Sequence, residues 1–212
     1  MAPASRRLLW WKLAVWVGCL VPLVLLFSRG FGAAGLSLGA NPIETVLLTT
    51  GITALNILLV SLAVTPVRIL SGQNYLARLR RPLGLFSFFY LLLHFLTYLI
   101  LDLRLDWPML WTDIAERPYI TVGVAALVGM IPLALTSTAA MQRRLGRRWA
   151  RLHQLVYGIA ILAVVHFLWQ VKLDIREPLI YAGILALLLG FRIQRGLQLK
   201  RKRARAAAES SR

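Results

Sequence analysis

Residues 85–103 have the sequence LFSFFYLLLHFLTYLILDL, an apolar run with one histidine, His94, near its middle. A helix needs about 20 mainly apolar residues to cross the hydrocarbon core of a bilayer, which is about 30 Å thick. The stretch therefore predicts a membrane-spanning helix that carries an ionisable side chain within it. Such side chains are costly in a membrane and are usually functional.

Five further stretches have a similar length and composition. The six predicted spans lie near residues 8–27, 43–64, 85–103, 119–139, 152–171 and 179–196. The loops between them are too short for a second domain. The predicted fold class is an all-α membrane protein, with a six-transmembrane-helix bundle over residues 1–199. The basic tail at residues 200–212 is predicted to be disordered.

The composition supports a membrane protein. Of the 212 residues, 58% are hydrophobic and 16% are charged, whereas soluble domains average about 45–50% apolar and about 25% charged residues. The single cysteine, Cys19, excludes a disulfide framework, a Cys-ligated zinc site and covalent haem attachment through a CxxCH motif.

The net charge of +17 is distributed very unevenly. Lys and Arg gather before the first span, after the second and fourth spans, and in the tail, whereas all but one of the eight acids fall on the other side. The positive side of a membrane protein faces the cytoplasm, so both termini are predicted to be cytoplasmic. The charge is thus explained by topology and by contact with anionic membrane lipid, and no nucleic-acid partner is expected.

All three histidines of the chain, His94, His153 and His166, fall within predicted spans. A neutral imidazole is a strong ligand for haem iron. At about 1.5 Å per residue, His94 and His166 lie about 14 and 21 Å from the cytoplasmic end of their helices, so tilted helices could bring them to one haem. His153 lies at the cytoplasmic edge, where it could serve a second haem or have no ligand role.

Other roles are compatible with these residues. Histidines within a membrane can form a metal site or a proton pathway, or can be hydrogen-bonded packing residues. Arg80, which stands 14 residues before His94, is explained by cytoplasmic topology or by pairing with haem propionates.

Six short runs resemble a known family. They are Leu62-Ala63-Val64-Thr65-Pro66-Val67-Arg68, Arg80-Arg81-Pro82-Leu83-Gly84-Leu85, Arg117-Pro118-Tyr119-Ile120-Thr121-Val122-Gly123, Leu133-Ala134-Leu135-Thr136-Ser137, Arg144-Leu145-Gly146-Arg147-Arg148-Trp149 and His166-Phe167-Leu168-Trp169-Gln170-Val171-Lys172. In this order they are similar to the MsrQ family, formerly YedZ, over about residues 7–199.

The resemblance implies a ferric-reductase-like transmembrane fold in the bacterial inner membrane. It implies one or two b-type haems and FMN as cofactors. The family's haem histidines fall on His94, His153 and His166, and Arg80 stands where oxidase relatives have a further histidine. Such a subunit passes electrons from the quinone pool to MsrP, a periplasmic molybdopterin enzyme that repairs methionine sulfoxide. It has no catalytic residues of its own and is an electron-transfer subunit of a reductase complex.

Two other functions are compatible with the sequence. One is a ferric or cupric reductase with a metal ion as acceptor, and the other is a non-redox transporter. If MsrP is the acceptor, the acidic segment 102–118 is predicted to be its docking surface, through Asp106, Asp113 and Glu116.

Overall fold

The computed structural model describes residues 3–171 and 174–210, and within these residues it contains helices and no strand. The helices are α1 (Pro3–Gly30), η1 (Ala33–Gly35), α2 (Pro42–Ser71), η2 (Asn74–Leu79), α3 (Arg80–Thr97), η3 (Tyr98–Asp102), α4 (Trp107–Glu116), α5 (Pro118–Leu135), α6 (Ala139–Leu145), α7 (Arg147–Leu152), α8 (Leu155–Gln170) and α9 (Arg176–Ser210).

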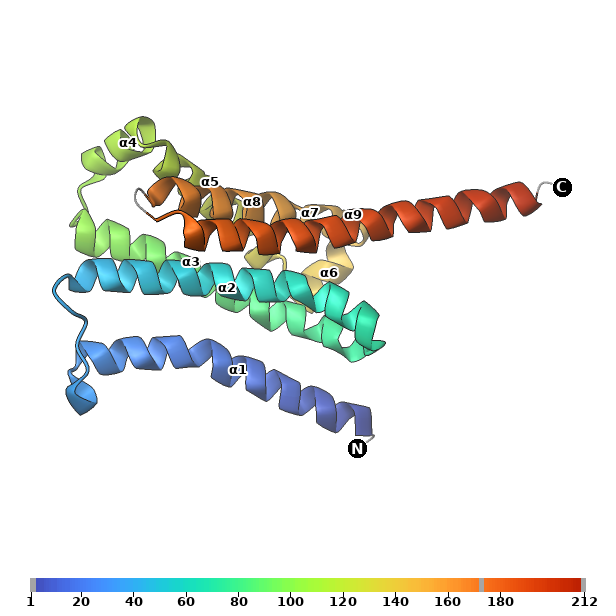
Figure 1. Ribbon diagram of the computed structural model, residues 1–212, viewed down its shortest axis with the longest axis horizontal. Coiled ribbons are helices and arrows are strands. Elements are labelled where there is room, and N and C mark those ends of the chain that lie inside the picture. The colour runs from blue at the N-terminus through green and yellow to red at the C-terminus, as the bar shows by residue number, and fades with distance from the viewer. Residues whose placement is uncertain (1–2, 172–173, 211–212) are drawn as a thin grey trace.

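Six helical segments in the described ranges are long and apolar enough to cross a membrane. They contain α1, α2, α3, α5, α8 and α9, so the predicted all-α membrane fold is confirmed. The start of α1 and the end of α9 lie at the same end of the bundle, as an even number of spans requires (Figure 1). The cytoplasmic orientation of that end stays a prediction.

Local sequence sets the helix ends. The Asn41 side chain accepts a hydrogen bond from the backbone N–H of Glu44, and Pro42 occupies the first turn of α2, where its missing N–H is harmless. The same helix ends at Gly72, which has φ 70°, a left-handed conformation that glycine adopts without a steric penalty.

The structure differs from the sequence prediction at the basic tail, because α9 continues to Ser210. Residues 200–210 are rich in Ala, Arg and Lys, which are strong helix formers. They extend a helix that already exists, so no unfavourable nucleation step is needed. Residues 172, 173, 211 and 212 lie outside the described residues, among them Lys172 of the sixth family run.

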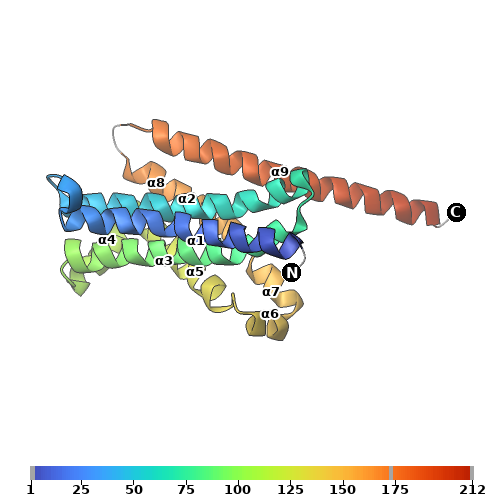
Figure 2. The ribbon, with the colours of Figure 1, turned by 90° about the horizontal axis from the view of Figure 1, so that it is seen from below.

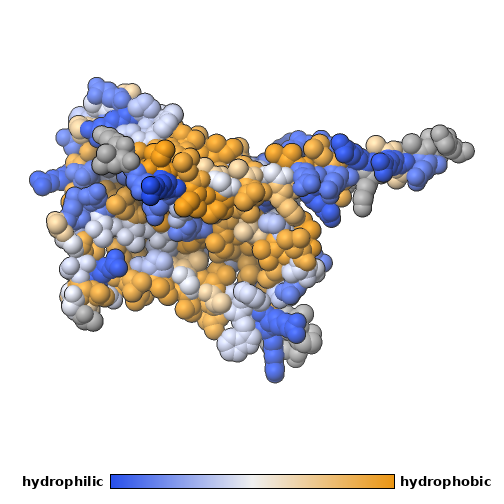
Figure 3. Space-filling view, in the orientation of Figure 1, coloured by the Kyte–Doolittle hydropathy of each residue, from blue (hydrophilic) through white to orange (hydrophobic). Residues whose placement is uncertain are grey.

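The bundle is built from two antiparallel helix pairs. Helix α2 packs along α3, α5 packs along α8, and α1 and α9 lie on the outside of these pairs (Figures 1 and 2). Hydrophobic residues cover the middle of the face shown in Figure 3, and hydrophilic residues gather at one end and on the projecting part of α9. This distribution suits a bundle surrounded by lipid.

Polar and small residues hold the helices together inside the apolar belt. The Ser87 hydroxyl of α3 donates to the Ala54 carbonyl of α2 at 2.9 Å. A Cβ added at Gly129 of α5 would lie 3.0 Å from the Ile159 side chain of α8, so this glycine permits close helix packing.

Helix α1 is tied to α3 by the buried Tyr90. Its hydroxyl donates to the Cys19 carbonyl at 2.6 Å and accepts from the Leu23 N–H at 3.1 Å. These two groups would ordinarily bond to each other in a helix, so the hydroxyl is inserted into the helix beside Pro22.

Candidate haem site

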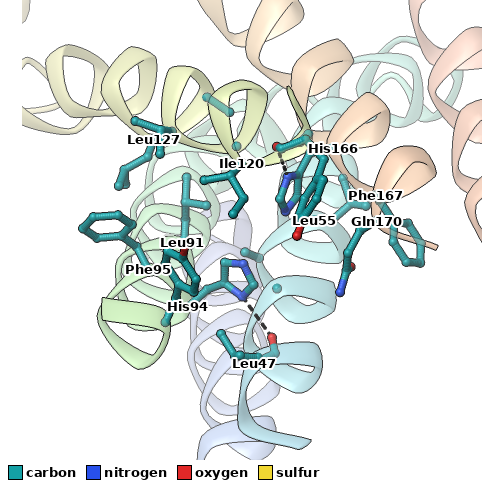
Figure 4. A pocket seen from close by; sticks show the side chains of 18 of the residues that line it. Leu47, Leu55, Leu91, His94, Phe95, Ile120, Leu127, His166, Phe167 and Gln170 are labelled. Carbon is teal, nitrogen blue, oxygen red and sulfur yellow. Dashed lines mark hydrogen bonds between the residues drawn. The ribbon is translucent and has the colours of Figure 1, made fainter. Parts of the chain in front are cut away.

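A cavity of about 270 Å³ lies between α2, α3, α5 and α8, and His94 and His166 both line it (Figure 4). Most of its other lining side chains are apolar, and they include Leu91, Ile120 and Phe167. Polar residues gather near one end, among them Arg117 and Gln170. The sequence prediction that His94 and His166 reach a common depth agrees with this geometry.

Each of the two imidazoles is oriented by a backbone carbonyl. The Nδ1 atom of His94 lies 2.9 Å from the Leu47 oxygen on α2, and the Nδ1 atom of His166 lies 2.6 Å from the Tyr119 oxygen on α5. A carbonyl can only accept, so Nδ1 carries the proton and donates it. The Nε2 atom of each ring therefore keeps its lone pair, which is the form that binds a metal.

The two free nitrogens face each other across the cavity. The ring centroids are 6.2 Å apart, with an interplanar angle of 82°, and the carbonyl-bonded nitrogens point away from each other (Figure 4). With metal–nitrogen bonds of about 2.0 Å, two imidazoles on opposite sides of one ion have centroids about 6.3 Å apart. The observed spacing fits one metal ion held by both rings.

The donor set favours haem over a bare metal ion. In the part of the chain that the structure describes, no group of three or more His, Cys, Asp or Glu side chains could hold a metal. Two histidines alone would leave a non-haem metal short of protein ligands. Haem brings nitrogen ligands of its own, so His94 and His166 would suffice to hold it, and it would supply one-electron chemistry at this site.

Two glycines make room for the rings, and sequence reasoning did not identify them. A Cβ at Gly51 would lie 3.0 Å from Nδ1 of His94, and a Cβ at Gly123 would lie 2.8 Å from Nδ1 of His166. Each glycine stands one helical turn after the residue whose carbonyl holds the ring. Each histidine lies 47 residues after that carbonyl residue. Gly51 and Gly123 therefore each stand 43 residues before the histidine that they accommodate, and this repeated Gly–His spacing is the signal that the sequence offers.

His153 and Arg80 lie away from the cavity. His153 follows α7, its ring packs 4.0 Å from the Trp149 ring, and its Nε2 atom lies 3.5 Å from the Thr136 hydroxyl. Arg80, at the start of α3, donates to the Thr65 hydroxyl. Neither residue lines the cavity that contains His94 and His166.

The acidic segment near the cavity is organised differently from the prediction. Asp113 is 2% exposed, accepts a hydrogen bond from the Tyr98 hydroxyl, and pairs with Arg117 at 3.1 Å. Desolvation lowers the pKa of Arg117, but the Asp113 carboxylate together with Tyr119 and Tyr98 raises that pKa overall. Asp113 therefore cannot belong to a docking surface, whereas Asp106 and Glu116 remain exposed.

Comparison with known proteins agrees with this architecture. Residues 49–164 match the family described as the ferric reductase like transmembrane component. No solved structure matches the chain.

Full-length relatives extend the match to almost the whole chain. A protein of Xanthomonas campestris pv. campestris (strain B100) is 48% identical over 98% of this chain and 97% of its own length. One of Rhodospirillum rubrum is 50% identical over 90% of each chain. Both are named protein-methionine-sulfoxide reductase heme-binding subunit MsrQ. The six apolar helices and these bacterial relatives indicate a multi-pass protein of the inner membrane. The chain therefore belongs to the MsrQ family and contains a ferric-reductase-like transmembrane component.

Proposed function

We propose that this protein is the haem-binding electron-transfer subunit of a methionine sulfoxide reductase system, with a b-type haem held between His94 and His166. The observation that carries the proposal is the facing pair of imidazoles at 6.2 Å, each with Nδ1 bonded to a backbone carbonyl. The names of relatives that match nearly the full chain support the same assignment.

The residues of this chain would orient the two histidine rings and would exclude water from the haem. The carbonyls of Leu47 and Tyr119 fix the tautomer and the direction of both rings, and the apolar lining keeps water from the iron. Arg117 and Gln170, at the polar end of the cavity, suit the propionate groups of haem. Haem bound in this way supplies reversible one-electron transfer.

In the proposed electron path, the quinone pool is the donor and periplasmic MsrP is the acceptor, which repairs methionine sulfoxide. The chain would carry no sulfoxide chemistry itself. FMN, which the family resemblance implies, is a second proposed cofactor, and flavin quantification of the purified protein tests it. Asp106 and Glu116 remain the candidates for MsrP docking, since both side chains are exposed.

Histidine substitutions test the proposed haem site. His94→Ala and His166→Ala should each abolish the haem, because one imidazole cannot provide both axial ligands. His153→Ala should retain it and should affect only a second haem, if one is bound. The measurement is haem per chain in the purified variants, with helix content by circular dichroism as the control for folding. Full haem content in the His94 variant would contradict the site.

Electron transfer can be tested separately in proteoliposomes. Quinol should reduce the haem, and addition of MsrP should reoxidise it. A ferric or cupric reductase, the second candidate function, would instead pass electrons to the metal ion without MsrP. The full-length match to named MsrQ proteins favours the first outcome.

A further inference from the structure

A second cluster of ionisable residues lies at the other end of the bundle. It consists of Arg68 near the end of α2, Arg80 at the start of α3, and Arg192 in α9, and we refer to these three residues as the arginine cluster. None of them lines the cavity that contains His94 and His166. Arg80 is 14 residues from His94, about 21 Å along α3, which is beyond the reach of propionates of a haem bound at His94.

Pro66 leaves one backbone carbonyl of α2 free to accept a hydrogen bond from the cluster. A proline within a helix has no N–H, so the carbonyl four residues earlier loses its helical partner. That carbonyl belongs to Leu62, and Arg192 donates to it at 2.7 Å. Arg192 also donates to the Tyr157 hydroxyl of α8 at 2.7 Å. The sequence run that contains Thr65, Pro66 and Arg68 thus builds part of this cluster.

The hydrogen bonding of the three arginines is incomplete. The Nε atoms of Arg68, Arg80 and Arg192 are all buried and have no hydrogen-bond partner. A buried donor without a partner is costly, and more so when it is charged. Three donors that lack acceptors in one place indicate a missing group rich in acceptor atoms.

The charge of the cluster is not balanced by the protein. Arg68 and Arg192 both act electrostatically on Arg80, so the three positive charges lie within range of one another. The sequence has no Asp or Glu between Glu44 and Asp102, or between Glu177 and Glu209. The one ion pair found among the described residues, Arg117 with Asp113, lies at the opposite end. The compensating anion must therefore come from outside the chain.

From these observations we infer that the arginine cluster binds a phosphate oxyanion, and that the ligand is the headgroup of an anionic phospholipid. A guanidinium group binds a phosphate with two parallel hydrogen bonds. Arg68 and Arg80 lie at the ends of α2 and α3, which is the level of lipid headgroups, and basic pockets between membrane helices on the cytoplasmic side bind such headgroups.

The surface beside the cluster favours a lipid over a soluble phosphate. Val67, Leu70 and Ile193 are 49%, 79% and 64% exposed, and each lies within two residues of Arg68 or Arg192 in the sequence. An apolar surface next to buried cations accommodates acyl chains next to a charged headgroup. This inference is independent of haem binding and of the proposed electron path.

The test uses the full chain, purified in detergent and titrated with lipid in native mass spectrometry. Binding of phosphatidylglycerol, an anionic lipid, is compared with binding of phosphatidylcholine, in which the choline cation neutralises the charge of the phosphate. The double variant Arg80→Gln/Arg192→Gln removes two members of the cluster and retains hydrogen-bonding groups. Its matched control is Arg81→Gln/Arg195→Gln, which removes the same number of charges from exposed positions on the same two helices.

We expect the unaltered protein to retain one phosphatidylglycerol in preference to phosphatidylcholine. The cluster variant should bind that molecule about tenfold or more weakly, and the control variant should not differ from the unaltered protein. If millimolar inorganic phosphate displaces the lipid fully, the arginine cluster still binds an oxyanion, but its ligand is a soluble phosphate and not a lipid headgroup. If inorganic phosphate does not displace the lipid, the ligand of the arginine cluster is the lipid headgroup.

The unaltered protein alone can overturn the inference. It would do so if it retained the two lipids equally and if inorganic phosphate had no effect on their binding. An equal loss of phosphatidylglycerol in the cluster and control variants would also overturn it, because general surface charge would then explain the binding.

Discussion

The two cavity histidines are each held by one backbone carbonyl, and this bond decides which ring nitrogen is free. The carbonyls of Leu47 and Tyr119 take the Nδ1 protons of His94 and His166. Because Gly51 and Gly123 have no side chain, each ring can lie directly against the neighbouring helix. The residues that shape the site are therefore glycines and carbonyls as much as the histidines.

Alanine at these glycines should disturb the site. A Cβ at position 123 would lie 2.8 Å from Nδ1 of His166, which is closer than Cβ atoms in real proteins approach a neighbouring side chain, and overpacking of this kind costs about 1–3 kcal/mol. Gly123→Ala should lower haem affinity by about tenfold, and Gly51→Ala should lower it less. Haem titration of the apoprotein measures both effects.

Gly158→Ala is the control for these substitutions, since an added Cβ there meets nothing within 4 Å and lies on the same helix as His166. Unchanged haem affinity in Gly123→Ala would show that the ring does not depend on this space.

Tyr90 allows a prediction about stability. Tyr90→Phe would leave the Cys19 carbonyl and the Leu23 N–H without the hydroxyl that links them. An unsatisfied buried polar group costs about 1–3 kcal/mol, so thermal unfolding in detergent should occur at a lower temperature. Tyr181→Phe, which keeps its ring packed on Phe167, is the matched control, and equal unfolding temperatures for the two variants would contradict the prediction.

At the residue scale, the sequence identified the histidines and missed their supports. Three histidines within spans are recognisable because ionisable groups are rare in apolar helices. Gly51 and Gly123 cannot be recognised individually, because glycine is common in membrane helices, and only their equal spacing from a histidine distinguishes them. The prediction that Asp113 lies on a docking surface is wrong because a sequence does not show burial, and the bonds of Asp113 to Tyr98 and Arg117 depend on how α4 folds back.

At the scale of helices, α4 joins the two pairs at the end of the bundle nearer the cavity. Asp106 caps its start by accepting from the Met109 N–H at 2.9 Å, and Asp113 binds Tyr98 and Arg117. Asp113→Asn should therefore destabilise the protein by about 1.5–3 kcal/mol, the value of hydrogen bonds to a charged group. Asp106→Asn should cost little, because asparagine caps helices equally well. Thermal unfolding of the two variants measures both losses of stability. A larger loss in Asp106→Asn than in Asp113→Asn would contradict the roles given to these residues.

The helix pairs α2/α3 and α5/α8 present the same arrangement twice, with a carbonyl, a glycine one turn later, and a histidine on the partner helix. Apolar length predicted the spans well. It did not predict the break between α7 and α8, where the helix stops at Leu152 and restarts at Leu155. The unequal depths calculated for His94 and His166 have another cause: α3 begins at Arg80 and not at the predicted boundary near residue 85, so His94 is 14 residues from the start of its helix, as His166 is from Leu152.

At the scale of the whole molecule, the two ends of the bundle have different chemistry. One end carries the paired histidines, α4 and most of the acids, and the other carries the arginine cluster. Charge counting predicted this asymmetry, because it requires only residue type and span boundaries. It could not predict that three arginines converge, since residues 68, 80 and 192 meet only in the folded chain.

The measurement that tests the central claim most directly is a reduced-minus-oxidised visible spectrum of the purified protein, with haem quantified per chain. The account predicts sharp b-type bands from a low-spin haem with two histidine ligands, and one haem per chain at the site between His94 and His166. A protein that contains no haem after expression with an ample haem supply would contradict the account, and the facing imidazoles would then need another ligand.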